Sequence, residues 1–520
     1  MVALDGDNSF SAVLPEPYES NGTFSFNFGI KDNRAKLVTI TRFPEFIRER
    51  KNWDWAFSDL SNLEYMCDFH VDNLTSGKCM FENCTKLKAF PSFDTSRMTS
   101  AEGMFRGCST ATECPEYDFQ SNTNMNECFY RCYKLTEVTI HNTGNVKDWG
   151  HAFFACSSLA RGPIVDTSSG TNFSGTFQGC GSMVSIPSYE FSKGVTFTET
   201  FRDCKKLTDV PYLDMKNGSS FNYFFYGCSA LTFGPEMDVA KGKTFVAFFM
   251  MCSSLTGTPD YDLPNATTLS SFFDCCSSLK NHGKLNTSAD LKTVSRMFAE
   301  CRILETVDLF DTESVTSVKN MFLNCFALET VPLFDLGSCT DFNSMFSGCK
   351  KLSTVPPLNT GSGTDFGYMF YCNYSLKALP VFNTANGKNF GGMFSDCTQL
   401  VSVPDFDTGA GTSFTRIINN CPRIEKLPAL NLSSCTSEQV LANIGWLPVS
   451  LTDFGGFIGL DQDHDCSRYP NLSHDSLLNI IRLAADVDGK TLTFTTSQLE
   501  KLNKEEIGIA TGKGWMIETP

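Results

Sequence analysis

The most reactive side chains in this sequence are cysteines, and most of them recur at one spacing. The chain has 520 residues and 23 cysteines. One cysteine column repeats every 24 residues from Cys84 to Cys276, and after a one-residue insertion it resumes at Cys301. Its members are Cys84, Cys108, Cys132, Cys156, Cys180, Cys204, Cys228, Cys252, Cys276, Cys301, Cys325, Cys349, Cys397 and Cys421, with Asn373 in the one missing place.

The spacing of the cysteine column decides which cysteine chemistry is reasonable. Side chains stacked in register lie about 4.8 Å apart, whereas a disulfide prefers Cβ atoms about 3.8 Å apart. A zinc site would need a C-x-x-C or a nearby histidine pair, and neither accompanies the column. We therefore interpret these cysteines as small apolar residues lining a core. Spacing assigns no partners to the remaining cysteines, which are Cys67, Cys79, Cys114, Cys128, Cys275, Cys339, Cys372, Cys435 and Cys466.

An acid or its amide occurs ten residues after each place in the cysteine column. This row comprises Asp94, Asp118, Asn142, Asp166, Glu190, Asp214, Asp238, Asp262, Asn286, Asp311, Asp335, Asn359, Asn383, Asp407 and Asn431. A row of carboxylates would suit calcium or a cationic partner. The alternative is a turn in which each side chain accepts backbone N–H groups, as Asp and Asn commonly do. Because Asp and Asn exchange freely here, an acceptor is needed and a charge is not, which favours the turn.

No catalytic, cofactor or metal motif is complete. "AKGKT" (240–244) lacks the first glycine of a P-loop, where Met237 stands. "DQDHD" (461–465) begins like an EF-hand, but Cys466 and Leu472 occupy its glycine and glutamate places. The six histidines are scattered, and no G-x-S-x-G elbow occurs. We predict that the protein is not an enzyme and has no catalytic residues, cofactor or metal.

The repeated columns require a solenoid to position them. Phe usually precedes the cysteine by three residues, Leu follows it by three, and Pro follows it by seven. A turn of 24 residues cannot bury its own apolar face, so neighbouring turns must stack. Segments such as "TDFNSMFSGC" (340–349) have a short helical spacing, and "LSTVPPLN" (352–359) is compatible with an extended segment. The predicted fold is an α/β solenoid, a leucine-rich-repeat-like array of about 16 turns of 24 residues over 50–445.

The two ends lack the repeat and read as caps or docking modules. Residues 1–49 alternate apolar and polar side chains, which predicts a small β cap. Residues 446–520 predict an α/β cap with helices over 473–487 and 496–512 and strands over 490–495 and 515–518. Solenoid ends need such covering, because a terminal turn would otherwise expose its apolar face.

The repeat resembles a known family. "MFENCTKLKAFPSFDTS" (80–96) and "MFLNCFALETVPLFD" (321–335) are similar to repeats of the BspA-like leucine-rich-repeat family, and the match covers about three quarters of the chain. Members are surface proteins and adhesins of bacteria and some protists, and similar repeats occur in bacteriophage proteins. The C-terminal segment resembles the tail that often follows such repeats in gut bacteria and their phages.

The resemblance implies attachment or binding. Residues 1–20 lack the basic and apolar regions of a Sec signal, and no run approaches 18 apolar residues. We therefore expect a non-enzymatic phage virion protein, a tail fibre or appendage used for host attachment, localised in the virion. The alternatives are a BspA-like adhesin of the bacterial cell surface and an intracellular repeat scaffold.

The net charge and the positions that vary between repeats limit the classes of partner that we expect. The net charge of −16 disfavours nucleic acid and anionic membranes. Expected partners are a host-surface glycan or protein and other virion proteins, and analogy with attachment fibres suggests a homotrimer. The binding face should be built from columns that vary, and no single residue stands out among them. Such positions include Ser92, Glu116, Ser188, Tyr212, Glu236, Asp260 and Pro357.

Overall fold

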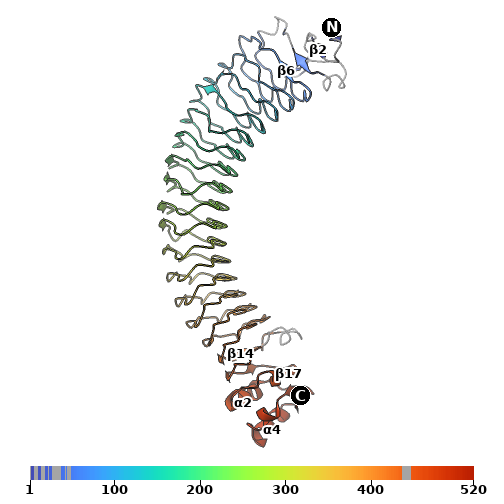
Figure 1. Cartoon of the computed structure of the whole chain (residues 1–520), viewed down its shortest axis with the longest axis vertical. Coiled ribbons are helices and arrows are strands. Elements are labelled where there is room, and N and C mark those ends of the chain that lie inside the picture. Colours follow the sequence, from blue (N-terminus) through green and yellow to red (C-terminus); the bar gives the residue numbers. More distant parts are fainter. Residues whose placement is uncertain are drawn as a thin grey trace. The chain divides into compact units, whose positions relative to one another are not determined.

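The computed structural model describes residues 2–4, 10–12, 18–20, 23–25, 37–40, 43, 49–435 and 447–520. It divides into two compact units, Met1–Ala266 and Thr267–Pro520, which we call the first unit and the second unit. In each unit the chain winds into a stack of similar turns (Figure 1). The predicted leucine-rich-repeat-like solenoid is confirmed, with about 18 turns where about 16 were expected.

The first unit opens with β-structure. β1 (Val2–Leu4) pairs antiparallel with β2 (Phe10–Ala12), and β3 (Tyr18–Ser20) pairs antiparallel with β4 (Thr23–Ser25). Stacking in parallel begins where β2 meets β5 (Thr39–Ile40). Later turns contribute very short strands, namely β6 (Tyr65–Met66), β7 (Tyr117–Asp118), β8 (Ile140–His141), β9 (Leu213–Asp214), β10 (Met237–Asp238) and β11 (Tyr261–Asp262).

A second line of contacts joins the turns eight residues before each cysteine place. Ser76 bridges to Ser100, and Ser100 bridges to Asn124, each in parallel and 24 residues along the chain. The same bridges continue through the first unit to Thr244 and recur in the second unit from Thr268 to Ser413. Each turn is therefore held in register with the next, because the residue at this position forms a β-bridge with the residue at the same position of the following turn.

The segment expected to be helical forms consecutive β-turns, so that part of the prediction is wrong. Residues 49–435 contain no helix. The N–H of Met80 donates to the carbonyl of Gly77 within its own turn (3.1 Å), whereas the N–H of Phe81 donates to the carbonyl of Met104 in the next turn (2.8 Å). Successive backbone N–H groups thus donate alternately to a carbonyl of the same turn and to a carbonyl of the next turn. A helix would keep all of them within the segment.

Left-handed residues produce this alternation. Cys79 (φ 52°) and Asn83 (φ 59°) lie five and one residues before the place of Cys84, and the same two places are left-handed in turn after turn. A left-handed residue every fourth position reverses the winding before a helix can propagate. Apolar side chains still fall at helical spacing, which is why the sequence pattern resembled a helix.

Stacked phenylalanines form the core of the turns. The rings of Phe129, Phe153 and Phe177 are fully or almost fully buried, with centroids 5.4 and 5.5 Å apart and planes within 6° of parallel. Column cysteines and the leucines three residues later are buried beside them. Each such Phe or Leu contributes about 1.5–3 kcal/mol on burial.

The second unit begins with further turns, including β12 (Leu285–Asn286), and its stacking continues past the last column cysteine. β13 (Lys426–Leu427) pairs in parallel with β15 (Asp453–Phe454), and β14 (Leu430–Asn431) pairs in parallel with β16 (Phe457–Ile458). β17 (His464–Asp465), β18 (Lys490–Thr493) and β19 (Trp515–Glu518) then form a parallel three-stranded sheet, with β18 in the centre.

Within the described residues, the helices lie at the C-terminal end of the second unit. They are the 3-10 helix η3 (Cys466–Arg468), α2 (His474–Leu483), α3 (Thr496–Leu499) and α4 (Lys504–Gly512). The helix expected over 496–512 is divided into α3 and α4, because Thr495 and Asn503 each begin a capping box, with Gln498 and Glu506 respectively. No helix in the described part of the chain is long and apolar enough to cross a membrane.

Candidate functional site

Column cysteines are hydrogen-bond donors to the backbone. The Sγ of Cys108 donates to the carbonyl of Phe81 at 3.1 Å, and this carbonyl also accepts the N–H of Cys84. The same contact recurs from Cys204 to the carbonyl of Phe177 at 3.1 Å. Each thiol therefore satisfies the second lone pair of a buried carbonyl in the preceding turn. Interpreting the cysteines as apolar core residues captured their burial and missed this bond.

Burial also makes these thiols chemically inert. None of the 23 cysteines forms a disulfide, and the column members are buried. Desolvation raises the pKa of Cys84 and of Cys180 to about 12, from an ordinary value of 9.0. Because the thiolate is the nucleophile and the metal ligand, a buried thiol with a raised pKa performs neither role at neutral pH.

Asn373 replaces a column cysteine and makes the same contact. Its Nδ2 donates to the carbonyl of Phe346 at 3.0 Å, and that carbonyl also accepts the N–H of Cys349. The side chain is fully buried, and its Oδ1 has no hydrogen-bond partner. A donor is thus the property that the place requires.

The row of acids and amides forms turns, which confirms the hydrogen-bonding interpretation. The Oδ1 of Asp94 accepts the N–H of Ser96 at 2.9 Å, and the Oδ1 of Asp407 accepts the N–H of Gly409 at 2.7 Å. Each is an Asx turn that ends the extended part of a repeat. Among the described residues, no three His, Cys, Asp or Glu side chains gather closely enough to hold a metal ion.

A second row of short polar side chains was missed at the sequence level. It lies eight residues before the cysteine places, on the line of parallel bridges. The Oδ1 of Asp148 accepts the N–H of Gly150 at 2.9 Å and the Nδ2 of Asn172 in the next turn at 2.7 Å. The sequence feature that could have revealed this row is that every one of its positions holds Asn, Asp, Ser or Thr. Its role is structural.

The candidate binding positions share one place in the repeat, eight residues after the cysteine. We call this column the variable row. All seven candidates singled out from the sequence are exposed, namely Ser92, Glu116, Ser188, Tyr212, Glu236, Asp260 and Pro357. The residue that follows each row member is usually buried, as Phe93 and Leu213 are. The variable row therefore stands out from the apolar layer behind it.

Several members of the variable row are large, apolar and exposed. Ile164 is 86% exposed in the first unit, and in the second unit Leu309, Leu333 and Val381 are 62%, 57% and 68% exposed. From the sequence alone, these four residues were not singled out. The signal was present as an apolar residue in a place that elsewhere often holds Ser, Glu or Asp.

In the second unit the apolar members are consecutive. Leu309, Leu333, Pro357 and Val381 occupy four successive turns, and we call them the apolar stripe. Buried rings support it from behind, since Phe310 and Phe334 lie 5.3 Å apart between centroids. Single exposed apolar residues are ordinary, but a contiguous row of them indicates an interaction surface.

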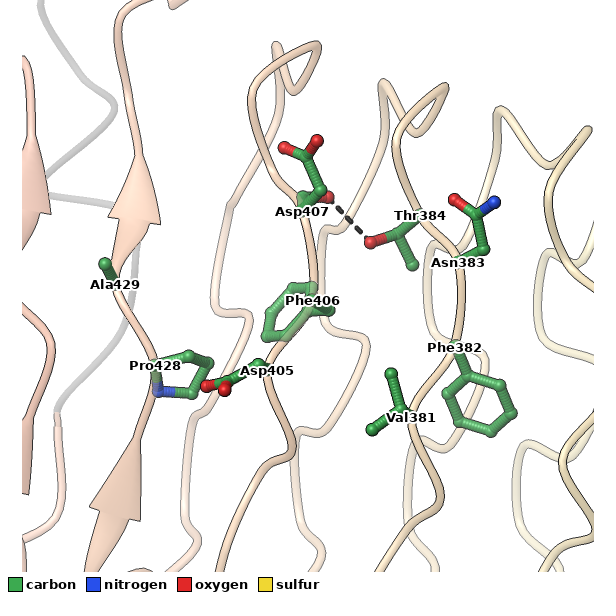
Figure 2. Close-up of a pocket in the computed structure, with 9 residues that line it drawn as sticks. All are labelled: Val381, Phe382, Asn383, Thr384, Asp405, Phe406, Asp407, Pro428 and Ala429. Atoms are coloured by element: carbon green, nitrogen blue, oxygen red, sulfur yellow. Dashed lines mark hydrogen bonds between the residues drawn. The ribbon is translucent and has the colours of Figure 1, made fainter.

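The apolar stripe continues into a groove of about 410 Å³ (Figure 2). Val381, Phe406, Pro428 and Ala429 supply its apolar lining, and Asp405 is among its polar groups. Phe406 is half-buried, unlike most of the residues in its column, so part of its ring is available.

Polar groups complete the groove beside the Phe406 ring. Asn383 and Asp407 lie along one side of it. The Oγ1 of Thr384 donates to the backbone carbonyl of Asp407 at 2.7 Å, which ties two neighbouring turns of the wall together. The groove therefore combines apolar surface with carboxylates.

Carboxylates flank the start of the apolar stripe. Glu305, Asp308, Glu329 and Asp335 are exposed around Leu309 and Leu333, and Asp311 is half-exposed. Glu329 forms a long ion pair with Lys351, at 3.5 Å between solvent-exposed side chains. This part of the surface is apolar along its centre and acidic on its flanks.

The repeat belongs to a described family. Residues 51–162, 123–237, 243–355 and 324–429 match the model described as "Mycoplasma protein of unknown function, DUF285". These stretches together cover more than half of the 520 residues. The chain belongs to the DUF285 family. The 24-residue turn described above is thus a DUF285 repeat in its three-dimensional form.

Several solved structures resemble this DUF285 protein at low sequence identity. A leucine-rich repeat protein from Eubacterium ventriosum has 12% identity and a TM-score of 0.29, over 90% of this chain and 91% of its own. An internalin, InlF, from Listeria monocytogenes has 12% identity and a TM-score of 0.21, over 67% and 87%. The functional domain of InlJ from the same bacterium, described as including a cysteine ladder, has 10% identity and a TM-score of 0.21, over 71% of each chain. No curated protein matches the chain.

Proposed function

We propose that this DUF285 protein is a non-enzymatic binding protein that engages a partner protein through the variable row. The observation that carries the proposal is the exposure of large apolar side chains in this row, such as Leu333 and Val381, while the residues that follow them, Phe334 and Phe382, are buried. A structural role does not explain these side chains, because burying them would gain stability and exposing them gains none.

The nucleophilic and acidic rows support binding rather than catalysis. The pKa of Cys180 is raised by burial, and its thiol already donates to the carbonyl of Phe153. Asp94 and Asp407 are engaged in Asx turns. These repeated groups that could do chemistry are therefore committed to the architecture of the turn.

A protein ligand suits the variable row better than a small molecule. The row is long and open, and it presents aliphatic and aromatic side chains of the kind that anchor protein interfaces. A solenoid provides such an extended surface and no deep pocket.

For the biological setting we propose a virion appendage that uses this surface in host attachment. Support comes from the resemblance of the repeats to BspA-like repeats, which also occur in bacteriophage proteins. A bacterial cell-surface adhesin and an intracellular scaffold remain the alternatives. Each setting would employ the same variable row.

Density-gradient fractionation of the source material tests the setting. We expect this protein to sediment with particles that contain nucleic acid. Sedimentation with cell envelopes would replace the virion proposal by the adhesin, and a soluble pool would replace it by the scaffold.

Photo-crosslinking tests the binding face itself. A photoreactive amino acid is placed at Leu333 in the full chain, and in a control at Lys319, which is exposed on the turn segment of the same repeat. We expect a discrete crosslinked protein from Leu333 and none from Lys319 after illumination in the source material. Equal crosslinking from both positions, or none from either, would contradict the proposed face.

A further inference from the structure

The spacing of the apolar stripe selects the secondary structure of its partner. Successive members are one solenoid turn apart, which is about 4.8 Å between stacked strands. An α-helix rises about 5.4 Å per turn, so side chains at i, i+3 or i+4, and i+7 meet successive turns of the stripe. An extended strand presents same-face side chains about every 6.6 Å, and it loses register within two turns.

The length of the surface is sufficient for a stable helical contact. From Leu309 to Ala429 the variable row crosses five turn-to-turn steps, or about 24 Å along the stack. A helix of about 16 residues spans this distance at about 1.5 Å per residue. At the far end, the exposed part of the Phe406 ring and the walls formed by Val381 and Pro428 can receive a terminal apolar side chain.

Charge on both sides of the stripe selects the polar residues of that helix. Exposed Glu305, Asp308 and Asp335 lie near the start of the stripe, and Asp405 and Asp407 lie in the groove. A helix with acidic flanks would bring like charges together and desolvate them. Lysine or arginine on the flanks would pair with these carboxylates. The net charge of −16 also disfavours a second copy of this chain as the occupant.

We propose that the apolar stripe and the groove at its end bind an amphipathic α-helix of a partner protein, with lysine or arginine flanking the apolar face of the helix. The proposal rests on the proposed function and specifies the partner's chemistry. The helix lies along the stacking direction of the second unit. Its aliphatic side chains contact Leu309, Leu333, Pro357 and Val381 in turn, and its basic side chains approach the flanking carboxylates.

Fluorescence anisotropy with a designed peptide tests this inference on the full-length chain. The probe is a fluorescein-labelled 16-residue helical peptide with Leu on one face and Lys on both flanks. One control peptide has the same composition with its Leu spread around the helix, and a second has Glu in place of Lys. We expect saturable binding of the probe that weakens with salt, and binding at least about tenfold weaker for either control.

A pair of protein variants locates the binding. Leu333→Ser with Val381→Ser should weaken probe binding about tenfold, because two apolar anchors are removed. The matched control is Ile164→Ser with Tyr212→Ser, which changes two exposed members of the variable row in the first unit. This control should bind the probe within twofold of the parent chain. All four positions are exposed, and thermal melting verifies that both variants fold.

Three outcomes would overturn the inference. They are no saturable binding of the probe, equal binding of the scrambled peptide, and equal loss of binding in the control variant. The proposed function fails separately. A discrete crosslink from Leu333 combined with no probe binding would retain the binding face and reject the basic helix as its occupant.

Discussion

At the scale of single residues, buried carbonyls explain the recurrence of cysteine. A Phe carbonyl such as that of Phe81 accepts one backbone N–H and has a second lone pair in a dry core. Cysteine is small enough to lie beside the stacked rings and still has a donor to offer. Serine would add a more strongly hydrated hydroxyl, and alanine would leave the lone pair unsatisfied.

Restoring cysteine at Asn373 tests this explanation. The amide donates to the carbonyl of Phe346, but its own Oδ1 is buried without a partner. Asn373→Cys should keep a donor, remove the unpaired acceptor and raise the apparent free energy of unfolding by about 1 kcal/mol. Urea denaturation followed by circular dichroism measures the change. Cys349→Asn in the neighbouring turn is the reciprocal control and should be destabilising, whereas a destabilising Asn373→Cys would reject the donor argument.

An ion pair with one buried partner provides a second test at this scale. Asp274 is fully buried, and Arg296 reaches both of its carboxylate oxygens, at 2.7 and 3.1 Å. The hydrogen bond to Asp274 raises the pKa of Arg296. Arg296→Ala would leave a buried carboxylate without its cation and should lower the apparent free energy of unfolding by about 3 kcal/mol.

The control for Arg296 is a surface pair. Arg302 contacts Glu300 at 3.1 Å, and the Arg302 side chain is largely exposed. Arg302→Ala should therefore cost less than about 1 kcal/mol in the same denaturation experiment. Equal losses for Arg296→Ala and Arg302→Ala would show that burial of Asp274 does not determine the cost.

At the scale of the repeat element, left-handed residues replace a helix by paired turns. Two places per turn have positive φ, and many of them carry side chains, as at Tyr223 and Ala155. Such residues pay a conformational cost that glycine avoids. The stacked turn compensates by giving every second N–H a carbonyl in the neighbouring turn.

Glycine substitution measures this cost. Ala155 has φ 57°, so Ala155→Gly should raise the apparent free energy of unfolding by about 0.5–1 kcal/mol, after the entropic cost of glycine is included. Ala152 lies in the same turn, is fully buried and is absent from the positive-φ places. Ala152→Gly should therefore be destabilising by about 1 kcal/mol. Destabilisation of equal size in both variants would contradict the strain argument.

At the scale of the whole molecule, many thiol pKa shifts in the same direction add together. Burial raises the pKa of thiols in both units, for example Cys84, Cys180 and Cys421, each to about 12. Above pH 9 the unfolded chain loses thiol protons that the folded chain retains. Because the folded state then binds more protons, its stability falls as pH rises. Each thiol contributes up to about 1.4 kcal/mol per pH unit.

Alkaline instability is therefore an expected property of the whole array. The urea midpoint should be steady up to about pH 8.5 and should fall steeply between pH 9 and 11. Iodoacetamide labelling of the native protein with peptide mapping is the control. We expect the half-exposed Cys67, Cys372 and Cys435 to be labelled before any column cysteine. A midpoint that does not change up to pH 11, or early labelling of the column, would contradict the shared burial of these thiols.

The accuracy of the fold prediction from the sequence differed between parts of the molecule. The 24-residue period and the inward columns were correct, because residues such as Phe153 and Leu159 repeat in a register that only stacking can bury. The helical piece was wrong, because two consecutive turns with left-handed residues give the same apolar spacing as one short helix. The division of the last predicted helix depended on capping by Asn503, which competes locally with helix propagation.

The sequence indicated which column of the repeat could form a binding face, but it did not indicate that several residues in this column are apolar and exposed. The variable row was identified as the column that does not repeat, and the structure shows most of its members exposed, with Ile140 as a buried exception. The consecutive apolar stripe was not recognised, because an apolar Leu309 or Leu333 in one column looks like core until its direction is known. That direction is set by the buried ring that follows, such as Phe310 or Phe334.

The amino-acid sequence by itself determined the solenoid, its period, its apolar core and its Asx turns, because these depend on spacing and on short-range hydrogen bonds. Only the tertiary structure decided which groups of one turn contact groups of the next turn. The thiol of Cys108 meets the carbonyl of Phe81 across 27 residues of chain, and the apolar stripe arises from residues 24 apart. Both are relations between stacked turns, and stacking brings residues together that no local pattern connects.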